Sequence, residues 1–242
     1  MHPETDMQMD SNIADVTETR VDAADIPELF IFGDSHTAAL DLGAKAEGIS
    51  TGLLYLSGNI WHAGLITIHA EREIDQAGSR YVRRRVTEAR AAMGGQLFRH
   101  GAPVLASAGY HLGRLLPPMT HRGHTVDEAA FAADPDASFM SSAVLEAMIT
   151  QRRRTIWRAL RRIATRCDLT IIAPPILSDD PMSNMAARMI TRRLREYGLQ
   201  VFDPREVDGP LGRVLPDEWR AEDGVHGNAA YGQALLQHIL EP

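Results

Sequence analysis

Short apolar runs alternate with longer amphipathic stretches along most of this chain. The runs typical of strands are LFIF (29–32), GLLYL (52–56), PVLASA (103–108), LTIIA (169–173) and LQVFD (199–203). Between them, apolar residues recur every three or four positions, which is the spacing of one helix face. Strands that alternate with helices favour a parallel sheet covered by helices on both faces. The pattern therefore predicts an α/β domain with five strands.

This spacing predicts four helices, in addition to one that begins at Thr37 after the first strand. They cover residues 79–93, 142–165, 183–197 and 228–240. The first two carry many arginines away from their apolar faces. Because the chain has a formal net charge of −7, we expect these faces to be exposed to solvent, with their arginines in ion pairs. We do not interpret them as a binding groove for a polyanion. Nucleic-acid binding is accordingly not expected.

Two stretches interrupt the alternation of strands and helices. Residues 1–26 are acidic and poor in large apolar side chains, which is typical of a disordered tail. We therefore expect one folded domain over residues 27–242, and its 44% hydrophobic residues can build a core. Residues 115–141 are the least regular stretch inside this domain, and a long irregular segment favours a loop that covers a substrate.

The sequence gives no sign of a secretory signal, a membrane span, a metal or a cofactor. The N-terminal residues lack the basic and apolar regions of a signal peptide, and no apolar run approaches a span of about 20 residues, so a cytoplasmic protein is expected. The single cysteine, Cys167, excludes an internal disulfide and is interpreted as a small core residue. His121 and His124 lack a third ligand nearby. Phosphate-binding glycine motifs and HExxH are absent.

The first predicted strand ends in Gly33, Asp34, Ser35 and His36. In an open α/β sheet, ligands bind at the carboxyl ends of the strands, and the helix expected after Ser35 would offer backbone N–H groups to an oxyanion. A serine hydroxyl becomes a nucleophile only when a base removes its proton. The adjacent His36 points away from its neighbour's side chain in most backbone geometries, so the base must come from elsewhere in the fold.

A better base lies near the other end of the chain, in AEDGVHGNAAYG. Asp223 and His226 are three residues apart in a glycine-containing turn before the last helix, and a carboxylate at this spacing can reach the imidazole and fix its tautomer. Each feature also has a structural interpretation. Asp34 or Ser35 can act as a helix N-cap, and Asp223 with His226 can be a hydrogen-bonded turn.

FGDSHTAAL, followed roughly 190 residues later by DGVHGNAAYG, resembles the SGNH hydrolases, also called the GDSL esterase/lipase superfamily, over about residues 27–242. The resemblance implies a flavodoxin-like three-layer α/β/α sandwich with a mostly parallel five-stranded sheet. It also implies catalytic roles for Ser35 as nucleophile, His226 as general base and Asp223 as the acid that orients the imidazole. The backbone N–H of Ser35 would donate to the oxyanion.

The family's second and third blocks supply further oxyanion donors. In YLSGNIWHAG, the resemblance implies that Gly58 gives a backbone N–H, with Gly64 as an alternative and Asn59 close by. The third block departs from the family pattern, because ASAGYHLGR carries His111 where members carry an asparagine, if Gly109 is the block's glycine. An imidazole N–H can replace the amide as a donor. Losing one such donor typically costs about 100- to 1000-fold in rate.

GDSH in place of GDSL resembles the SGNH domains associated with O-acylation of bacterial polysaccharides. This favours carbohydrate acyl groups, and Arg114, just after the third block, becomes a candidate for the substrate pocket together with Asn59. Trp61 and His62 follow the second block, and Trp61 could stack on a sugar ring. Its alternative interpretation is a half-buried aromatic residue that covers the sheet edge.

Together, the residues and the resemblance predict a serine esterase or deacylase that works without a cofactor. It would hydrolyse or transfer an O-acyl group of a small-molecule or glycan ester through an acyl-enzyme intermediate. The alternative is a weakly active or inactive SGNH-fold domain that binds a glycan or a protein. If His111 points away from Ser35 and no other donor replaces it, the alternative is favoured. Acyl chain, alcohol, pathway and oligomeric state stay open.

Overall fold

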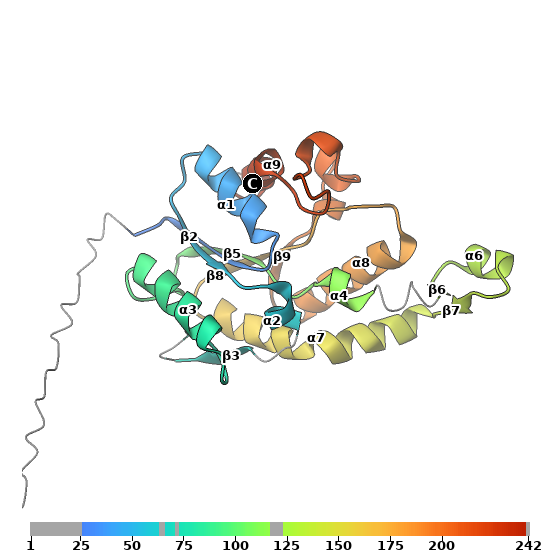
Figure 1. Cartoon of the computed structure of the whole chain (residues 1–242), viewed down its shortest axis with the longest axis horizontal. Helices are drawn as coiled ribbons and strands as arrows, with labels where there is room; N and C mark the ends of the chain where they lie inside the picture. The colour runs from blue at the N-terminus through green and yellow to red at the C-terminus, as the bar shows by residue number, and fades with distance from the viewer. Residues whose placement is uncertain (1–25, 63–65, 71–72, 117–122, 241–242) are drawn as a thin grey trace, which may run out of the picture.

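Five parallel strands form the central sheet of the protein (Figure 1). The structure is a computed structural model and describes residues 26–62, 66–70, 73–116 and 123–240. The strand order is β2-β1-β5-β8-β9, with bounds β1 (Leu29–Gly33), β2 (Thr51–Tyr55), β5 (Pro103–Ser107), β8 (Asp168–Ile172) and β9 (Gln200–Phe202). All five predicted strands are confirmed, with each end within one residue of its prediction.

The sheet is covered on both faces, which makes the fold a three-layer α/β/α sandwich of the flavodoxin-like kind. The covering helices are α1 (Thr37–Ala46), α3 (Arg80–Ala92), α7 (Ser142–Ala164), α8 (Pro181–Glu196) and α9 (Ala229–Leu240). Alternate residues of β1 divide the core: Phe30 and Phe32 pack with α3, α7 and α8, whereas Leu29 and Ile31 pack with α1 and α9. In Figure 1, α1 and α9 lie above the sheet and α3 and α7 below it.

Side-chain caps determine where three of the helices begin. Ser79 accepts a hydrogen bond from the N–H of Val82 at the start of α3, and Ser141 accepts one from Val144 at the start of α7. Asp180 accepts from the N–H of Ser183, and Pro181 occupies the first turn of α8. A cap satisfies one of the backbone donors that a helix start leaves free. The Asp-Pro pair explains why α8 begins two residues before the predicted start.

Several short elements were not expected from the sequence. They are α2 (Gly58–His62), α4 (Leu112–Leu115), an antiparallel pair β3 (Ile66–His69) and β4 (Glu73–Gln76), and the 3-10 turns η2 (Pro204–Glu206), η3 (Pro210–Gly212) and η4 (Asp217–Trp219). Ile66 and Ile74 of the β3–β4 pair are buried in the core below the sheet. The strands are only four residues each, so their alternation is too short to distinguish from a loop.

The segment predicted to be an irregular cover, residues 115–141, contains regular structure in its described part. It holds β6 (His124–Thr125), α6 (Glu128–Ala133) and β7 (Ser138–Phe139), and these project from the sandwich at the right of Figure 1. Residues 123–141 do not line the pocket described below. The expected substrate cover is therefore not formed by this described part of the segment.

The arginine-rich helices differ from each other in their ion pairs. On α3, Arg85 donates to Glu88 at 2.9 Å and Arg84 lies 3.7 Å from the same carboxylate, as expected. On α7, the exposed arginines have no ion pair with any described residue, which corrects the expectation for that helix. In the described part of the chain, no helix combines the length and the apolar character that crossing a membrane requires.

The predicted N-terminal tail and two candidate residues lie outside the described part of the chain. Residues 1–25 of the predicted tail are not among the described residues, and neither are Gly64 and His121.

Cys167 is buried, as expected, and its Sγ lies 3.6 Å from the carbonyl oxygen of Ile163. Burial raises the pKa of its thiol to about 12, so the side chain is an unreactive core residue.

Candidate active site

Ser35 lies at the carboxyl edge of the sheet, between β1 and α1. The backbone of Gly33, the last residue of β1, has φ = +144° and runs close against Ser107 of β5. A Cβ atom at this position would overlap the backbone and side-chain oxygens of Ser107. Only glycine fits this approach without strain. The chain then leaves the sheet, so that Ser35 is held above its edge, next to the start of α1 at Thr37.

Asp34 holds this turn in place from inside. Its side chain is buried, and Oδ1 accepts hydrogen bonds from the backbone N–H of His36 at 3.1 Å and from the hydroxyl of Ser107 at 3.0 Å. The hydroxyl of Thr37 donates to the carbonyl oxygen of Asp34 at 2.6 Å. Asp34 therefore has a structural role in the turn, but it is not the helix N-cap of its alternative interpretation, because α1 begins after His36 without a side-chain cap. Ser107 was missed in the sequence, although a small polar residue at the end of a neighbouring strand is a recognisable signal.

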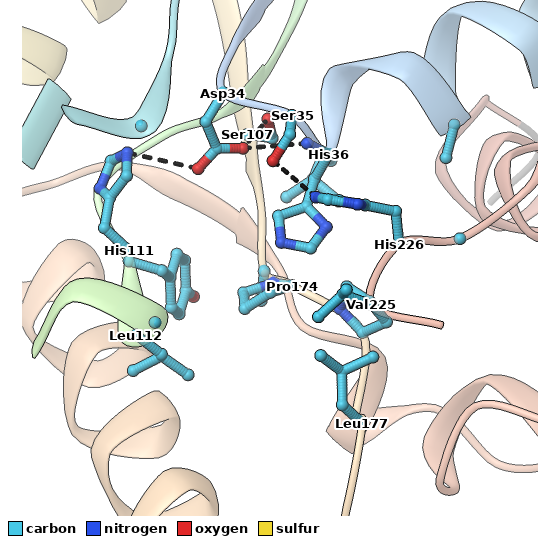
Figure 2. A pocket seen from close by; sticks show the side chains of 18 of the residues that line it. Asp34, Ser35, His36, Ser107, His111, Leu112, Pro174, Leu177, Val225 and His226 are labelled. Atoms are coloured by element: carbon cyan, nitrogen blue, oxygen red, sulfur yellow. Dashed lines mark hydrogen bonds and ion pairs between the residues drawn. The ribbon is translucent and has the colours of Figure 1, made fainter. Parts of the chain in front are cut away.

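Ser35, His226 and Asp223 form one chain of hydrogen bonds, and Figure 2 shows the bond between Ser35 and His226. His226 Nε2 lies 2.6 Å from Ser35 Oγ, and His226 Nδ1 lies 2.5 Å from Asp223 Oδ2. A carboxylate only accepts, so Nδ1 carries the proton and Nε2 of the neutral ring accepts the hydrogen of the serine hydroxyl. The hydrogen bond from His226, together with that from the N–H of Val225, lowers the pKa of Asp223 to about 2. The carboxyl group is thus ionised at neutral pH.

The loop that carries His226 is held by its own backbone hydrogen bonds. Asp223 Oδ1 accepts from the N–H groups of Val225 at 2.9 Å and of His226 at 3.1 Å. The carbonyl oxygen of His226 accepts from the N–H of Ala221 at 2.8 Å. Two residues later, the side-chain oxygen of Asn228 accepts from the N–H groups of Ala230 and Tyr231 and so caps α9. The same carboxylate therefore shapes the turn and orients the imidazole.

Close packing of α1 on α9 brings the two ends of the chain together. Ser35 precedes α1 and His226 precedes α9, and 191 positions separate them in the sequence. The helices meet through Gly43 and Gly232. A Cβ atom at Gly232 would overlap the carbonyl oxygen of Ala39, and one at Gly43 would overlap the backbone of α9. The absence of side chains at these two positions lets the helix starts, and with them the serine and the histidine, approach each other.

His111 reaches the same edge of the sheet from the loop after β5. Its backbone is left-handed, with φ = +50°, an uncommon conformation for a residue with a side chain. Its Nε2 lies 3.3 Å from Asp34 Oδ2, and its ring edge lies 3.8 Å from a Cβ atom built on Gly58. Burial lowers the pKa of His111 to about 4, so the ring is neutral at pH 7. The neighbouring carboxylate favours the tautomer that carries its proton on Nε2.

Two buried side chains of α7 hold the strained loop from behind. Arg153, whose side chain is fully buried, donates from Nε to the carbonyl oxygen of Tyr110 at 2.9 Å and from Nη2 to that of His111 at 3.1 Å. Trp157 Nε1 donates to the carbonyl oxygen of Gly109 at 3.2 Å. Burial lowers the pKa of Arg153 to about 10. The helical period predicts most arginines of this helix on its outer face and does not identify the role of Arg153.

The residues expected to form the oxyanion hole lie around one pocket. Ser35, Gly58 and His111 all line it, and the backbone N–H groups of Ser35 and Gly58 donate to no other described residue. Gly58 is the first residue of α2. These two N–H groups are therefore available to a ligand in the pocket, whereas His111 Nε2 lies beside Asp34 Oδ2.

The pocket has a volume of about 850 Å³, which is large enough for a drug-sized ligand. Asn59 and Arg114 line it, as predicted, together with apolar residues such as Leu112, Pro174 and Leu177 (Figure 2). Trp61 does not line it, and this corrects the expectation that its ring stacks on a sugar. The ring is 1% exposed and packs against Phe32, with 5.8 Å between the ring centroids. Its indole belongs to the core because α2 turns it toward the sheet.

His36 has a closer relation to the site than its sequence position suggested. Its ring lies 4.9 Å from the ring of His226, centroid to centroid, and it lines the pocket. Burial is the main cause that lowers the pKa of His36. The ring is therefore a neutral neighbour that packs beside the base. Among the described residues, no group of three or more His, Cys, Asp or Glu side chains is arranged to hold a metal ion.

Comparisons with known proteins give a distant structural likeness and no family. No protein-family model matches it, and no curated protein matches it. One similar solved structure is described as a "putative platelet activating factor" from Streptococcus pneumonia. It shares 13% sequence identity, with 92% of this chain and 86% of that chain covered and a TM-score of 0.41. So distant a likeness carries nothing about activity, which has to be argued from the site itself.

Proposed function

We propose that this protein is a serine esterase or acyltransferase of the SGNH type, and that Ser35, His226 and Asp223 are its catalytic residues. The observation that carries the proposal is the unbroken hydrogen-bond chain from Ser35 Oγ through the imidazole of His226 to Asp223. A turn or a helix cap alone does not require the serine to meet a histidine 191 positions away. An ionised acid, a neutral imidazole and a hydroxyl in this order are the parts of an activated nucleophile.

In the proposed reaction, Ser35 Oγ attacks the carbonyl carbon of an ester while His226 Nε2 takes the hydroxyl proton. Asp223 stabilises the imidazolium ion that results. The N–H groups of Ser35 and Gly58, with the Nε2–H of His111, stabilise the negative charge on the former carbonyl oxygen. When the tetrahedral intermediate collapses, His226 gives its proton to the leaving alcohol.

The acyl group on Ser35 is then removed by the reverse sequence of proton transfers. Water gives hydrolysis and an alcohol, such as a sugar hydroxyl, gives acyl transfer. A carbohydrate substrate was expected from the GDSH block. The burial of Trp61 removes its ring as a platform for a sugar, so this part of the proposal now rests on the polar lining residues, among them Asn59 and Arg114.

Labelling with a fluorophosphonate probe tests the proposal directly. The wild-type protein should react, and Ser35→Ala should not react at all. His226→Ala should react about 10⁴-fold more slowly or worse, because no other group removes the proton. His238→Ala is the matched control, since His238 is exposed on α9, and it should react like the wild type. A folded wild-type protein that stays unlabelled would support the alternative, an SGNH-fold domain that only binds its ligand.

A further inference from the structure

The pocket around Ser35 continues into the interior between α1, α9 and the end of β8. Apolar side chains form this inner part, and Leu40, Ile172 and Leu235 among them are each less than 5% exposed. Two polar side chains, Tyr231 of α9 and Arg205 of η2, also line the pocket. An apolar cavity with a few polar groups is the usual form of a site that binds and orients a small ligand.

One buried polar atom of each of these two side chains lacks a hydrogen-bond partner among the described residues. Tyr231 is 3% exposed, and the side chain of Arg205 is 6% exposed. No hydrogen bond from a described residue reaches Tyr231 Oη or Arg205 Nε. Buried donors are almost always paired, because an unpaired donor loses the hydrogen bonds it makes with water. Tyr231 Oη and Arg205 Nε belong to side chains that line one cavity, where a ligand could supply the acceptor that each of them lacks.

The charges around the two donors indicate what kind of group they suit. Arg205 Nη1 lies 3.2 Å from Asp203 Oδ1 and 3.3 Å from the carbonyl oxygen of Pro174. Asp203 is 3% exposed, so its carboxylate balances the charge of the guanidinium in a buried setting. Burial raises the pKa of Tyr231, so its hydroxyl stays protonated and can donate. Both groups then offer hydrogens to an oxygen atom, and the balanced charge favours a neutral oxygen over a carboxylate.

We propose that Tyr231 and Arg205 form a polar subsite in the enclosed part of the pocket, and that it binds a hydroxyl or carbonyl oxygen on the acyl chain of the ester. The proposal rests on the proposed function of Ser35. The enclosed part suits the acyl chain, because the acyl group stays attached to the serine until the second step, whereas the alcohol has to leave first. The preferred acyl group is thus an oxygen-bearing chain and not a plain hydrocarbon.

Binding to the Ser35→Ala protein tests the subsite without any turnover. The ligands are methyl esters of ω-hydroxyalkanoic acids with three to seven methylene groups, each paired with the alkanoate ester that has a methyl in place of the hydroxyl. Isothermal titration calorimetry should show that one chain length of the hydroxy series binds about 10- to 100-fold more tightly than its alkyl partner. Equal affinities at every chain length would overturn the proposal.

Tyr231→Phe in the same background isolates one of the two donors. It should lower the preference for the hydroxy ester by about 10-fold. It should also leave Tm unchanged or slightly higher, because a hydroxyl without a partner contributes no stability. Tyr110→Phe is the matched control for stability: Tyr110 is equally buried, but its hydroxyl lies 2.7 Å from Thr191 Oγ1. Tyr110→Phe should lower Tm by about 2–4 °C. A similar loss in Tyr231→Phe would show a structural partner and overturn the proposal.

The two proposals fail in different measurements. Fluorophosphonate labelling of the wild-type protein decides whether Ser35 is activated, and ester binding by Ser35→Ala decides whether the subsite exists. If the protein is not labelled but prefers the hydroxy ester, the subsite is supported and the esterase is ruled out. If the protein is labelled but shows no preference, the esterase is supported and the subsite is ruled out.

Discussion

The side chains around Ser35 reach their charge states by different physical routes. Asp223 is half-exposed, and hydrogen bonds from His226 and Val225 keep it ionised. His111 is buried beside Asp34, and removal from water keeps it neutral despite the nearby carboxylate. At neutral pH the site therefore combines an ionised orienting acid with an uncharged donor. A neutral His111 can donate a hydrogen bond to an oxyanion without bringing a charge that would compete with the base.

The low pKa of His111 predicts a specific dependence of stability on pH. Between pH 6.5 and 4 the folded protein keeps His111 neutral, whereas the unfolded chain binds a proton there. Unfolding then takes up a proton, so the free energy of unfolding falls as the pH drops through this window. Between pH 7 and 4.5 the contribution of His111 amounts to about 2 kcal/mol. Urea unfolding at both pH values measures it.

His111→Asn is the matched variant for this measurement. Asparagine tolerates the left-handed backbone and offers an amide donor, but it does not titrate. The variant should lack the contribution of His111. Its free energy of unfolding should therefore fall by about 2 kcal/mol less than that of the wild type between the two pH values. Burial also lowers the pKa of His36, so His36 contributes to the fall in the free energy of unfolding in both proteins alike. If this free energy fell equally in the two proteins, His111 would be protonated in the folded state.

At the scale of elements, the site depends on how closely α1 and α9 approach each other. Alanine is a better helix former than glycine, by about 1 kcal/mol, so local propensity predicts that Gly232→Ala stabilises α9. Packing predicts the opposite, because the new Cβ atom would overlap the carbonyl oxygen of Ala39 in α1. A clash with backbone forces the helices apart, since a main chain cannot rotate away. We expect the packing effect to exceed the propensity effect.

Gly232→Ala should lower the free energy of unfolding by about 1–3 kcal/mol. It should also slow fluorophosphonate labelling by about 10-fold or more, because the starts of the two helices carry Ser35 and His226. Thermal unfolding and labelling kinetics measure the two effects. His238→Ala on the exposed side of α9 is the control and should change neither, because the His238 side chain bonds only within its own helix. A stabilised variant with unchanged labelling would show that the helices do not depend on this contact.

Element prediction from the sequence succeeded where the pattern of burial is local. Each strand of the sheet is an apolar run, and the long helices repeat apolar residues at the helical period, so their ends were predicted within one or two residues. The pair β3–β4 and the short strands β6 and β7 were missed. Strands of two to four residues have too few positions to establish an alternation, and they form because a partner strand is available.

At the scale of the whole molecule, the sheet and its two hydrophobic layers account for the fold. All buried members of the two core clusters lie between Leu29 and Leu236 in the part of the chain that the structure describes. We therefore propose that residues 27–242 form the folded domain, as the sequence predicts. The acidic N-terminal residues contain few large apolar groups that could add to the core.

Removal of residues 1–25 tests this proposal for the domain. The shortened chain keeps Ile26, which packs near Gly94, and Pro27, whose carbonyl oxygen accepts from Arg99 at 3.5 Å. Its Tm should lie within about 2 °C of that of the full chain, and its labelling rate within about 2-fold. Circular dichroism melts and the fluorophosphonate assay provide the comparison. A fall in Tm of roughly 4 °C or more would place part of the first 25 residues in the folded domain.

The sequence by itself determined the five strands of the central sheet, the long helices and the place of the serine. Apolar periodicity is a local property, and the Gly-Asp-Ser turn after β1 needs only neighbouring residues and the edge of one strand. The tertiary structure alone decided which distant residues meet. His226 reaches Ser35 because α1 and α9 pack through two glycines, Arg153 supports His111 from another helix, and Trp61 turns into the core instead of the pocket. These outcomes depend on the shapes of packed surfaces, which no local pattern encodes.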